Sequence, residues 1–331
     1  MEMVNSKGQI AARFRAMRIV HPLAEAAFDI MDDMRVCKQD SDDGEEQLAG
    51  ELFADSHAGK STTIRMYLET RVYNECIVRG LFPSGTDKKD VLKLQKLVLF
   101  IEIPADTRVK ALLSALLKKL DDPFPTKGNV TEMLHRVQIL LKKHNVELII
   151  FDEVGHLTIP KTDDDEAAKI HNHLTSFLRM GYPVLFVGIK AARSKIFGDS
   201  QGENRSMYDI DFLDFDYSNE AHRTIFRDFC ADLSISLVEK GIMREWSDFV
   251  GDGDEILSAL FEVSLGLLGG VARIVERACK FAFDEKALKV EIRHLEAAVD
   301  RLKGFANRSK GTRRNPFRDG LAAAKVVSHA A

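Results

Sequence analysis

The sequence predicts an α/β domain, with a parallel sheet flanked by helices, followed by a smaller helical domain. Short apolar runs that are typical of buried strands alternate with amphipathic, helix-length segments between residues 47 and 215. From residue 218 onward only the helical periodicity remains. A phosphate-loop sequence, Gly59-Lys60-Ser61, stands between the first strand-like run and the next helix, which is its usual place in such a sheet.

The N-terminal third of the chain begins with apolar residues at helical spacing in residues 8–36. We expect helices there that precede the nucleotide domain and pack against it. Residues 47–53 read as a weak strand leading into the phosphate loop, and residues 61–69 as the start of the following helix. Residues 96–104 predict a strong strand, because almost every residue is apolar and Pro104 ends the run.

The later segments continue the alternation. We expect strands at 146–152, 183–188 and 207–215, separated by helices at 107–120, 130–144 and 167–180, and then helices only, at 218–233, 254–263, 269–284 and 291–302. The expected divisions are an N-terminal helical segment (1–40), an α/β nucleotide-binding domain (41–216), a helical second domain (217–303) and a basic flexible tail (304–331). Because parallel strands need crossover connections, usually helices, this order favours a doubly wound sheet.

The phosphate loop differs from the usual pattern only in its first residue, where Ala54 replaces glycine. Backbone N–H groups of such a loop face phosphates at a helix N-terminus. We expect Lys60 to reach the β and γ phosphates and Ser61 to offer its hydroxyl to Mg²⁺. The residues expected to hold the nucleotide are Ser56, His57, Ala58, Gly59, Lys60, Ser61 and Thr62. The alternative is a solvated Gly-Lys-Ser sequence at an ordinary helix start.

A second motif follows about ninety residues later. Four apolar residues, Leu148 to Phe151, indicate a buried parallel strand that delivers Asp152 and Glu153 to its C-terminal edge, where ligands bind in open α/β sheets. We expect Asp152 to hold Mg²⁺ and Glu153 to polarise the water that attacks the γ-phosphate. The alternative is a strand ending in two solvated acids, but the upstream loop favours hydrolysis of a nucleoside triphosphate.

The composition is typical of a globular protein that stays in water. Of the 331 residues, 45% are hydrophobic and 30% charged, and no apolar run approaches the ~20 residues that cross a bilayer. The N-terminus lacks a basic stretch followed by an apolar core, so we expect a cytoplasmic protein without membrane contact. The four cysteines form no CxxC pair, which argues against a disulfide framework or a zinc site. His171 and His173 point to different faces of a helix and predict a helix surface.

Charge is segregated along the chain. The net charge of −4 argues against a protein that coats polyanions with its whole surface. Basic residues nevertheless follow one another without an intervening acid near the C-terminus, at Arg308, Lys310, Arg313, Arg314 and Arg318. This stretch is either a flexible tail or a tail that binds phosphate or a partner.

These motifs together resemble AAA+ ATPases, and most closely the TniB/TnsC type, which regulates DNA transposition. The resemblance covers roughly residues 20–303. It is carried by the phosphate loop, the strand of residues 148–157, Val184–Gly188 and the segment Gly266–Arg273. It implies an α/β domain with a helical lid, ATP and Mg²⁺ at the site, and a ring or helical filament on double-stranded DNA without sequence preference. It also implies a transposase partner and a target-selecting protein or RNA-guided complex.

The resemblance assigns further roles. Arg273 matches the lid arginine that reaches the nucleotide, and an arginine from the adjacent subunit completes each site, with Arg205 the matching residue and Arg193 the alternative. Ile189 stands where the family has a polar sensor of the γ-phosphate. The DNA contacts implied by position are Arg108, Lys110 and Lys127, each of which is equally readable as a solvated charge.

Three other functions stay open at this point. One is another DNA-handling AAA+ ATPase, such as a replication loader or a repair factor. A second is a nucleotide-gated scaffold with little turnover, motivated by Ala54 and Ile189. The last is a small-molecule kinase, against which Asp152 and Glu153 suit the activation of water.

Overall fold

The computed structural model describes residues 2–104, 108–156, 174–197, 206–212, 215–301 and 314–321. The chain divides into two compact units. One, here called the sheet unit, comprises Pro22–Ser56 and Lys60–Phe212; the other, the helical unit, comprises Met1–His21, His57–Gly59 and Leu213–Ala331. Residues 1–40, expected as one N-terminal segment, are thus shared between the two units.

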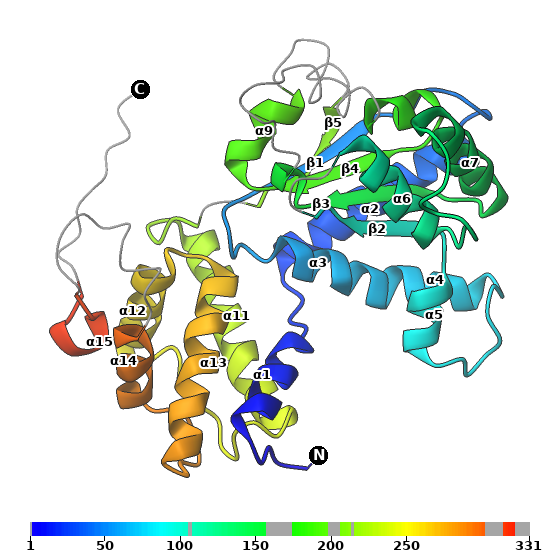
Figure 1. Ribbon diagram of the computed structural model, residues 1–331. Helices are drawn as coiled ribbons and strands as arrows, with labels where there is room; N and C mark the ends of the chain where they lie inside the picture. The colour runs from blue at the N-terminus through cyan, green and yellow to red at the C-terminus, as the bar shows by residue number, and fades with distance from the viewer. Residues whose placement is uncertain are drawn as a thin grey trace, which may run out of the picture. The chain divides into compact units, whose positions relative to one another are not determined.

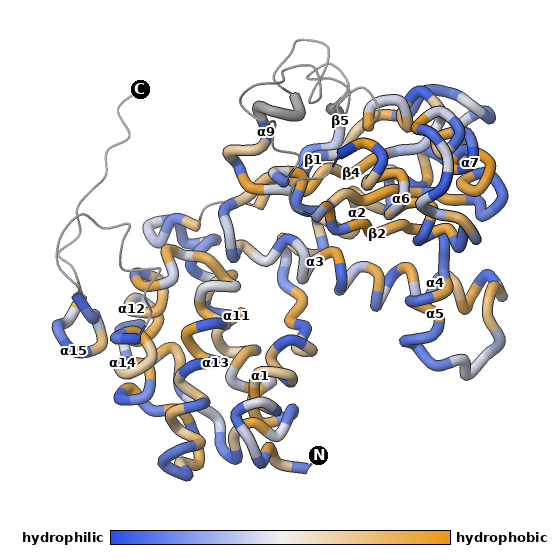
Figure 2. Tube along the Cα trace, viewed as in Figure 1, coloured by the Kyte–Doolittle hydropathy of each residue, from blue (hydrophilic) through white to orange (hydrophobic). Residues whose placement is uncertain are grey.

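The sheet unit is built on five parallel strands (Figure 1). They are β1 (Ala49–Phe53), β2 (Val98–Glu102), β3 (Leu148–Asp152), β4 (Val184–Gly188) and β5 (Ser206–Asp209), in the spatial order β2-β3-β4-β1-β5. Figure 2 shows hydrophobic residues concentrated along β2 and β4, as expected for strands covered on both faces. The predicted parallel α/β sheet is confirmed, although β5 ends earlier than expected, at Asp209.

The strand register brings the carboxyl ends of the strands to one edge. Phe53 of β1 pairs with Gly188 of β4, and Glu102 of β2 pairs with Asp152 of β3. The loop after β1 and the acids after β3, which are far apart in the sequence, therefore open onto the same edge.

The helices of the sheet unit lie on both sides of the sheet. They are α2 (Pro22–Asp40), α3 (Lys60–Tyr67), α4 (Tyr73–Val78), α5 (Lys88–Leu94), α6 (Val109–Lys119), α7 (Val130–Lys143), a helical segment over residues 174–179 and α9 (Lys190–Phe197). A π-helical turn, η1 (Leu68–Val72), joins α3 to α4, and a 3₁₀ turn, η2 (Val154–His156), follows β3. Helices α5 and α9 are additions to the predicted set.

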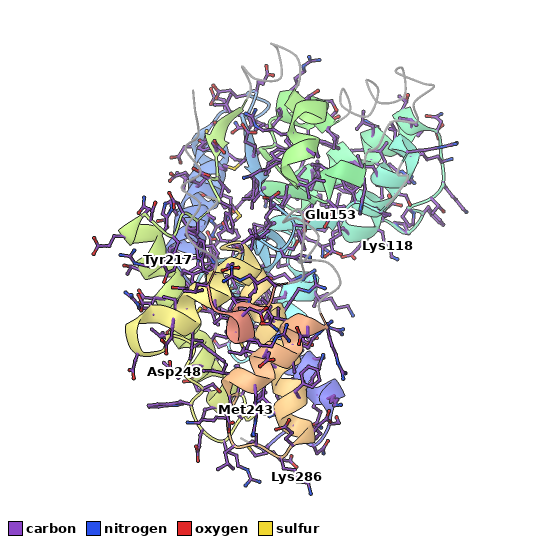
Figure 3. The ribbon with its side chains drawn as sticks, turned by 90° about the vertical axis from the view of Figure 1, so that its left-hand side faces the viewer. Lys118, Glu153, Tyr217, Met243, Asp248 and Lys286 are labelled. Carbon is purple, nitrogen blue, oxygen red and sulfur yellow. The ribbon has the colours of Figure 1, made fainter. Side chains whose placement is uncertain are left out.

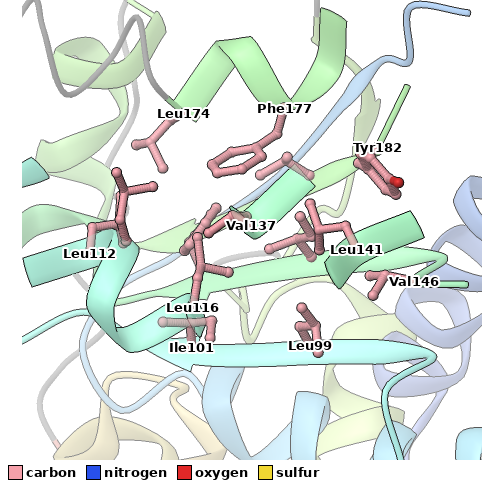
Figure 4. Close-up of a cluster of buried hydrophobic side chains, with 14 of the residues drawn as sticks. Leu99, Ile101, Leu112, Leu116, Val137, Leu141, Val146, Leu174, Phe177 and Tyr182 are labelled. Atoms are coloured by element: carbon pink, nitrogen blue, oxygen red, sulfur yellow. The ribbon is translucent and has the colours of Figure 1, made fainter. Parts of the chain in front are cut away.

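The main hydrophobic core fills the space between one face of the sheet and three helices (Figure 4). Leu112 and Leu116 of α6, Val137 of α7 and Phe177 of the 174–179 segment pack on strand residues such as Ile101. On the opposite face, Gly50 lets α2 approach closely. A Cβ atom at Gly50 would lie 2.8 Å from the Met34 sulfur. Burial of this kind, at about 25 cal/mol per Å² of apolar surface, is the main stabilising term.

The helical unit contains α1 (Lys7–Arg15), α11 (Glu220–Glu239), η3 (Asp252–Asp254), α12 (Glu255–Ser264), α13 (Leu268–Asp284), α14 (Ile292–Asp300) and α15 (Pro316–Asp319). Helix α1 packs against α13 and belongs to this unit. Among the described helices, none is alone long and apolar enough to cross a bilayer. Only Asp252–Ser264 and Leu268–Asp284 taken together, bent by 108° between them, reach that length and apolarity.

Part of the stretch expected as a flexible tail is docked on the helical unit. Residues 314–321 contain α15, which contacts α12 and α14. The buried Asn315 amide donates to the Glu296 carbonyl and to Asp300 Oδ1, both at 2.9 Å, while its backbone N–H donates to Asp319. Of the basic residues named in the tail, Arg308, Lys310 and Arg313 lie outside the described residues. Arg314 donates to the Gly320 carbonyl, and Arg318 pairs with Glu296 and Asp300.

Asn315→Ala should therefore destabilise the helical unit by about 1–3 kcal/mol, because it removes the two hydrogen bonds that the buried Asn315 amide donates. Urea-induced unfolding followed by circular dichroism measures the effect. Arg318→Gln is the matched control, because it removes ion pairs of a half-exposed side chain, to Glu296, Asp300 and Asp319, and should cost less than about 1 kcal/mol. Equal losses in both variants would contradict the docking role of Asn315.

The buried His21 predicts a pH dependence of the same unit. Its ring meets the edge of Phe229 at 6.3 Å between centroids, and burial lowers the pKa of His21 from 6.5 to about 4. Because the folded pKa lies below the unfolded value, the unfolded chain takes up the proton first. The contribution of neutral His21 to the free energy of unfolding is fully present above pH 6.5 and is lost as the pH falls towards about 4.

We expect wild-type stability to fall by about 2 kcal/mol more than that of His21→Phe between pH ~8 and pH ~5. Urea unfolding of both proteins at the two pH values gives this difference directly. Parallel losses in the two proteins would show that His21 titrates normally in the folded chain.

Candidate nucleotide-binding site

The phosphate loop connects β1 to α3 and is tightly turned. His57 and Gly59 adopt positive φ angles of 69° and 103°, a conformation that favours glycine and is strained for histidine. Ala54 is fully buried and its N–H donates to the Gly188 carbonyl at 3.2 Å. The φ angle of Ala54 is not positive, so the backbone at this position does not require the glycine of the usual pattern.

Lys60 lies at the start of α3 and reaches back over the loop. Its Nζ donates to the carbonyl oxygens of Ala54 and Asp55 at 2.8 and 2.9 Å. Burial lowers the pKa of Lys60, and the negative charges of Asp152, Glu153 and Asp55 oppose that shift. The ammonium group is thus held at the loop, beside the positive end of the helix dipole.

The two oxygen donors expected to hold Mg²⁺ are in direct contact. Ser61 Oγ donates to Asp152 Oδ2 at 2.6 Å, although the residues are 91 positions apart in the sequence. Asp152 is 2% exposed, and its other oxygen accepts the N–H of Glu153 at 2.8 Å. The structure therefore brings the end of β3 against the first turn of α3.

Glu153, labelled in Figure 3, is exposed and directly follows Asp152 in the chain. It adopts a positive φ of 60°, which is uncommon for a non-glycine residue and strains the backbone. The Glu153 carbonyl accepts the N–H of His156 at 2.8 Å, and the His156 ring bonds the carbonyl of Ile103 at 2.9 Å. The carboxylate is thus presented by a backbone that is fixed on both sides.

A third acid at this edge, Glu102, is missing from the sequence prediction. It ends β2 opposite Asp152 and pairs with Arg65 of α3 at 2.5 Å. The sequence indicates this residue, because Glu102 is a charged residue within the apolar run of the second strand, at the end of the strand that reaches the site.

The two arginines considered for action on a neighbouring subunit differ in what the structure shows. Arg205 lies outside the described residues. Arg193 of α9 binds Glu51 of its own chain with two hydrogen bonds, of 2.6 and 2.9 Å. Ile189, between β4 and α9, is 39% exposed at the position of the expected polar sensor.

Arg273 contacts the phosphate-loop residue His57, with which it shares the helical unit. Its Nη1 lies 2.6 Å from His57 Nε2. The N-terminus of α13 approaches the same residue closely, because a Cβ atom at Gly269 would lie 2.4 Å from the His57 carbonyl oxygen. A glycine is therefore required at position 269 for this approach.

The three residues named for DNA contact do not form one cluster. Arg108 and Lys110 stand at the N-terminal end of α6, which follows the carboxyl end of β2. Lys127 follows the other end of α6, and its ammonium group lies over the Phe124 ring at 4.5 Å from the centroid. The 11 residues of α6 place its two ends about 16 Å apart.

The comparisons with known proteins agree with this geometry. Residues 43–196 match a family model described as an AAA domain. This range contains the phosphate loop, β1 to β4 and the acids after β3. No curated protein sequence matches the chain significantly.

Several solved structures share the fold. The Orc1 protein of Aeropyrum pernix, solved in complex with DNA, overlays with a TM-score of 0.58 and 15% identity, over 89% of this chain and 68% of that chain. Cdc6p of Pyrobaculum aerophilum overlays with a TM-score of 0.60 and 13% identity, over 90% of this chain and 72% of that chain. The ADP form of the Aeropyrum pernix ORC2 protein overlays with a TM-score of 0.57 and 14% identity, over 86% of this chain and 69% of that chain. Residues 43–196 are thus similar to an AAA domain, and the described chain has the AAA+ P-loop fold with a C-terminal helical region.

Proposed function

We propose that the chain is an ATP-hydrolysing AAA+ protein that assembles on double-stranded DNA and regulates transposition. The observation that carries the hydrolytic part is the contact of Ser61 with Asp152, with Lys60 and Glu153 beside it at one sheet edge. A phosphate-binding loop, an acid for the metal and an acid for water then share one site, as hydrolysis of a phosphoanhydride requires.

The donor set fits Mg²⁺. The hydroxyl of Ser61 and the carboxylate of Asp152 are hard oxygen ligands that already meet, and Mg²⁺ prefers such ligands together with phosphate oxygens. When bound, the ion supplies charge neutralisation at the phosphates. Lys60 would exchange its bonds to the loop carbonyls for bonds to phosphate oxygens. The exposed carboxylate of Glu153 would orient a water molecule and accept its proton.

Support for action on DNA and for transposition comes from the resemblance to TniB/TnsC proteins and from the shared fold with Orc1, which was solved in complex with DNA. Arg108 and Lys110 would contact phosphates without reading sequence, and Arg205 would complete the site of the adjacent subunit. A transposase and a target-selecting protein or RNA-guided complex are the partners in this proposal.

One observation favours a second candidate, a nucleotide-gated scaffold with little turnover. Ile189 offers no hydrogen bond at the position where the family places a polar sensor, and its side chain is partly exposed there. A protein of this kind would bind ATP and assemble, with hydrolysis contributing little to its cycle.

Glu153→Gln should retain ATP binding and lose hydrolysis by about 10²- to 10⁴-fold, because the amide cannot accept the proton from water. Lys60→Ala should lose binding as well, since it removes a charged phosphate ligand. Single-turnover hydrolysis and equilibrium binding of labelled ATP separate these effects. Wild-type protein that binds ATP without turnover would replace the hydrolytic proposal by the scaffold.

Assembly on DNA should require nucleotide. With duplex DNA and a slowly hydrolysed ATP analogue, we expect rings or filaments of wild-type protein in electron micrographs, and none with Lys60→Ala or without nucleotide. Arg108→Gln and Lys110→Gln should weaken DNA binding and flatten its salt dependence by about one unit of slope each. Monomers under every condition would refute the assembly.

A further inference from the structure

Strand β1 carries a buried acid in an apolar setting. Glu51 is 3% exposed, and it stands two positions from Ala49 and from Phe53, which belong to or pack against the main hydrophobic core. Its register partner in β4 is the buried Phe186. An ionised carboxylate at such a position is costly unless it is paired, and loss of one partner of a buried pair is strongly destabilising.

Arg193 supplies the pairing. Its Nε donates to Glu51 Oε2 at 2.6 Å and its Nη2 to Oε1 at 2.9 Å, an arrangement in which both carboxylate oxygens are engaged. Arg193 lies in the first turn of α9 and is half-exposed. The ion pair therefore fixes the first turn of α9 to the middle of β1.

The same turn of α9 supports the segment after Glu153. Turn η2 packs against α9 and β4. A Cβ atom at Gly155 would lie 3.4 Å from the Ala192 Cβ, and one at Gly188 would lie 2.9 Å from Val154 Cγ2. Gly188 thus lets η2 pack closely on β4, and Gly155 of η2 lies in van der Waals range of Ala192 of α9.

Acids crowd the site of the ion pair. Asp209 of β5 is the register partner of Glu51 on the other side. Burial raises the pKa of Asp209, as do the charges of Glu51 and Asp211, whereas Arg193 lowers it. Arg193 thus offsets the charges of two neighbouring carboxylates, Glu51 and Asp209.

We propose that Glu51 and Arg193 are positioning residues for Glu153. This inference rests on the proposed hydrolytic function. The strained backbone of Glu153 persists only if its surroundings over-determine it. Hydrogen bonds to Asp152 and from His156 hold it, and the packing of η2, which contains His156, on α9 is a second support. Loosening α9 removes the second support and leaves the phosphate loop and Lys60 in place.

The first test is hydrogen exchange in the nucleotide-free protein. Glu51→Gln should accelerate exchange of the amides of Glu153 and His156, which donate to Asp152 and to the Glu153 carbonyl, and leave α3 unchanged. Glu147→Gln is the matched control, because Glu147 is equally a buried acid of the sheet unit, paired with Arg35 and Arg79 at the amino end of β3. Unchanged exchange at residues 153–156 in Glu51→Gln, or equal acceleration in the control, would overturn the inference.

The second test is kinetic. Glu51→Gln should lower kcat for ATP by about tenfold or more with KM unchanged, because misplacement of a reacting group by about 1 Å reduces rate rather than binding. In a Glu153→Gln background the same substitution should cause no further loss, since both act through one carboxylate. Additive losses would refute the positioning role.

Mixed oligomers separate this role from action on a neighbour. If Arg193 positions Glu153 of its own chain, mixing Arg193→Gln with Glu153→Gln protein restores no activity. Recovery on mixing would show that Arg193 acts across the subunit boundary and would overturn the inference. Failure of wild-type protein to hydrolyse ATP would refute the proposed function alone, because the exchange comparison tests the coupling without hydrolysis.

Discussion

The hydrogen bond between Ser61 and Asp152 is the contact on which the candidate site depends. It exists because parallel strands β1 and β3 end at the same edge, with β4 between them, so that the helix after one meets the acid after the other. Helix α3 is also fixed at its far end, where the Tyr67 hydroxyl donates to Asp32 at 2.6 Å and accepts from Arg35. An eight-residue helix held at both ends presents Lys60 and Ser61 with little freedom.

The far anchor of α3 is itself buried and charged. Arg35 is 2% exposed and binds Glu147, which precedes β3, with its Nε 2.9 Å from Oε2. Burial raises the pKa of Tyr67, so its hydroxyl stays protonated and donates at neutral pH. The sheet unit thus has one ion-pair network at the amino ends of its strands and another, Glu51 with Arg193, near the edge that carries the site. Both join helices to strands by charge rather than by apolar contact.

Local patterns were sufficient for the strands and for the phosphate loop. A short apolar run such as Leu148–Phe151, set between helix-length segments, predicts a buried strand. The sequence Gly59-Lys60-Ser61 predicts a tight phosphate-binding turn before a helix. The pair of Glu51 with Arg193 has no local signal, because its partners are 142 residues apart and each is ordinary in its own segment. Helix α5 was missed since it is short, and its start depends on one capping bond from Lys89 N–H to Asp87. The sequence did not predict the docking of Asn315 either. Its basic neighbours suggest a solvated tail, and the groups that accept its hydrogen bonds lie on α14, earlier in the sequence.

The docked segment around Pro316 changes what a shortened protein can reveal. A chain ending before residue 314 loses the basic tail and at the same time uncovers the surfaces of α12 and α14 on which α15 lies. Weaker partner binding by such a protein would then have two causes, lost cations and a newly exposed apolar surface prone to self-association. Neutralising the tail cations while keeping residues 314–321 separates electrostatic attraction from the integrity of the helical unit.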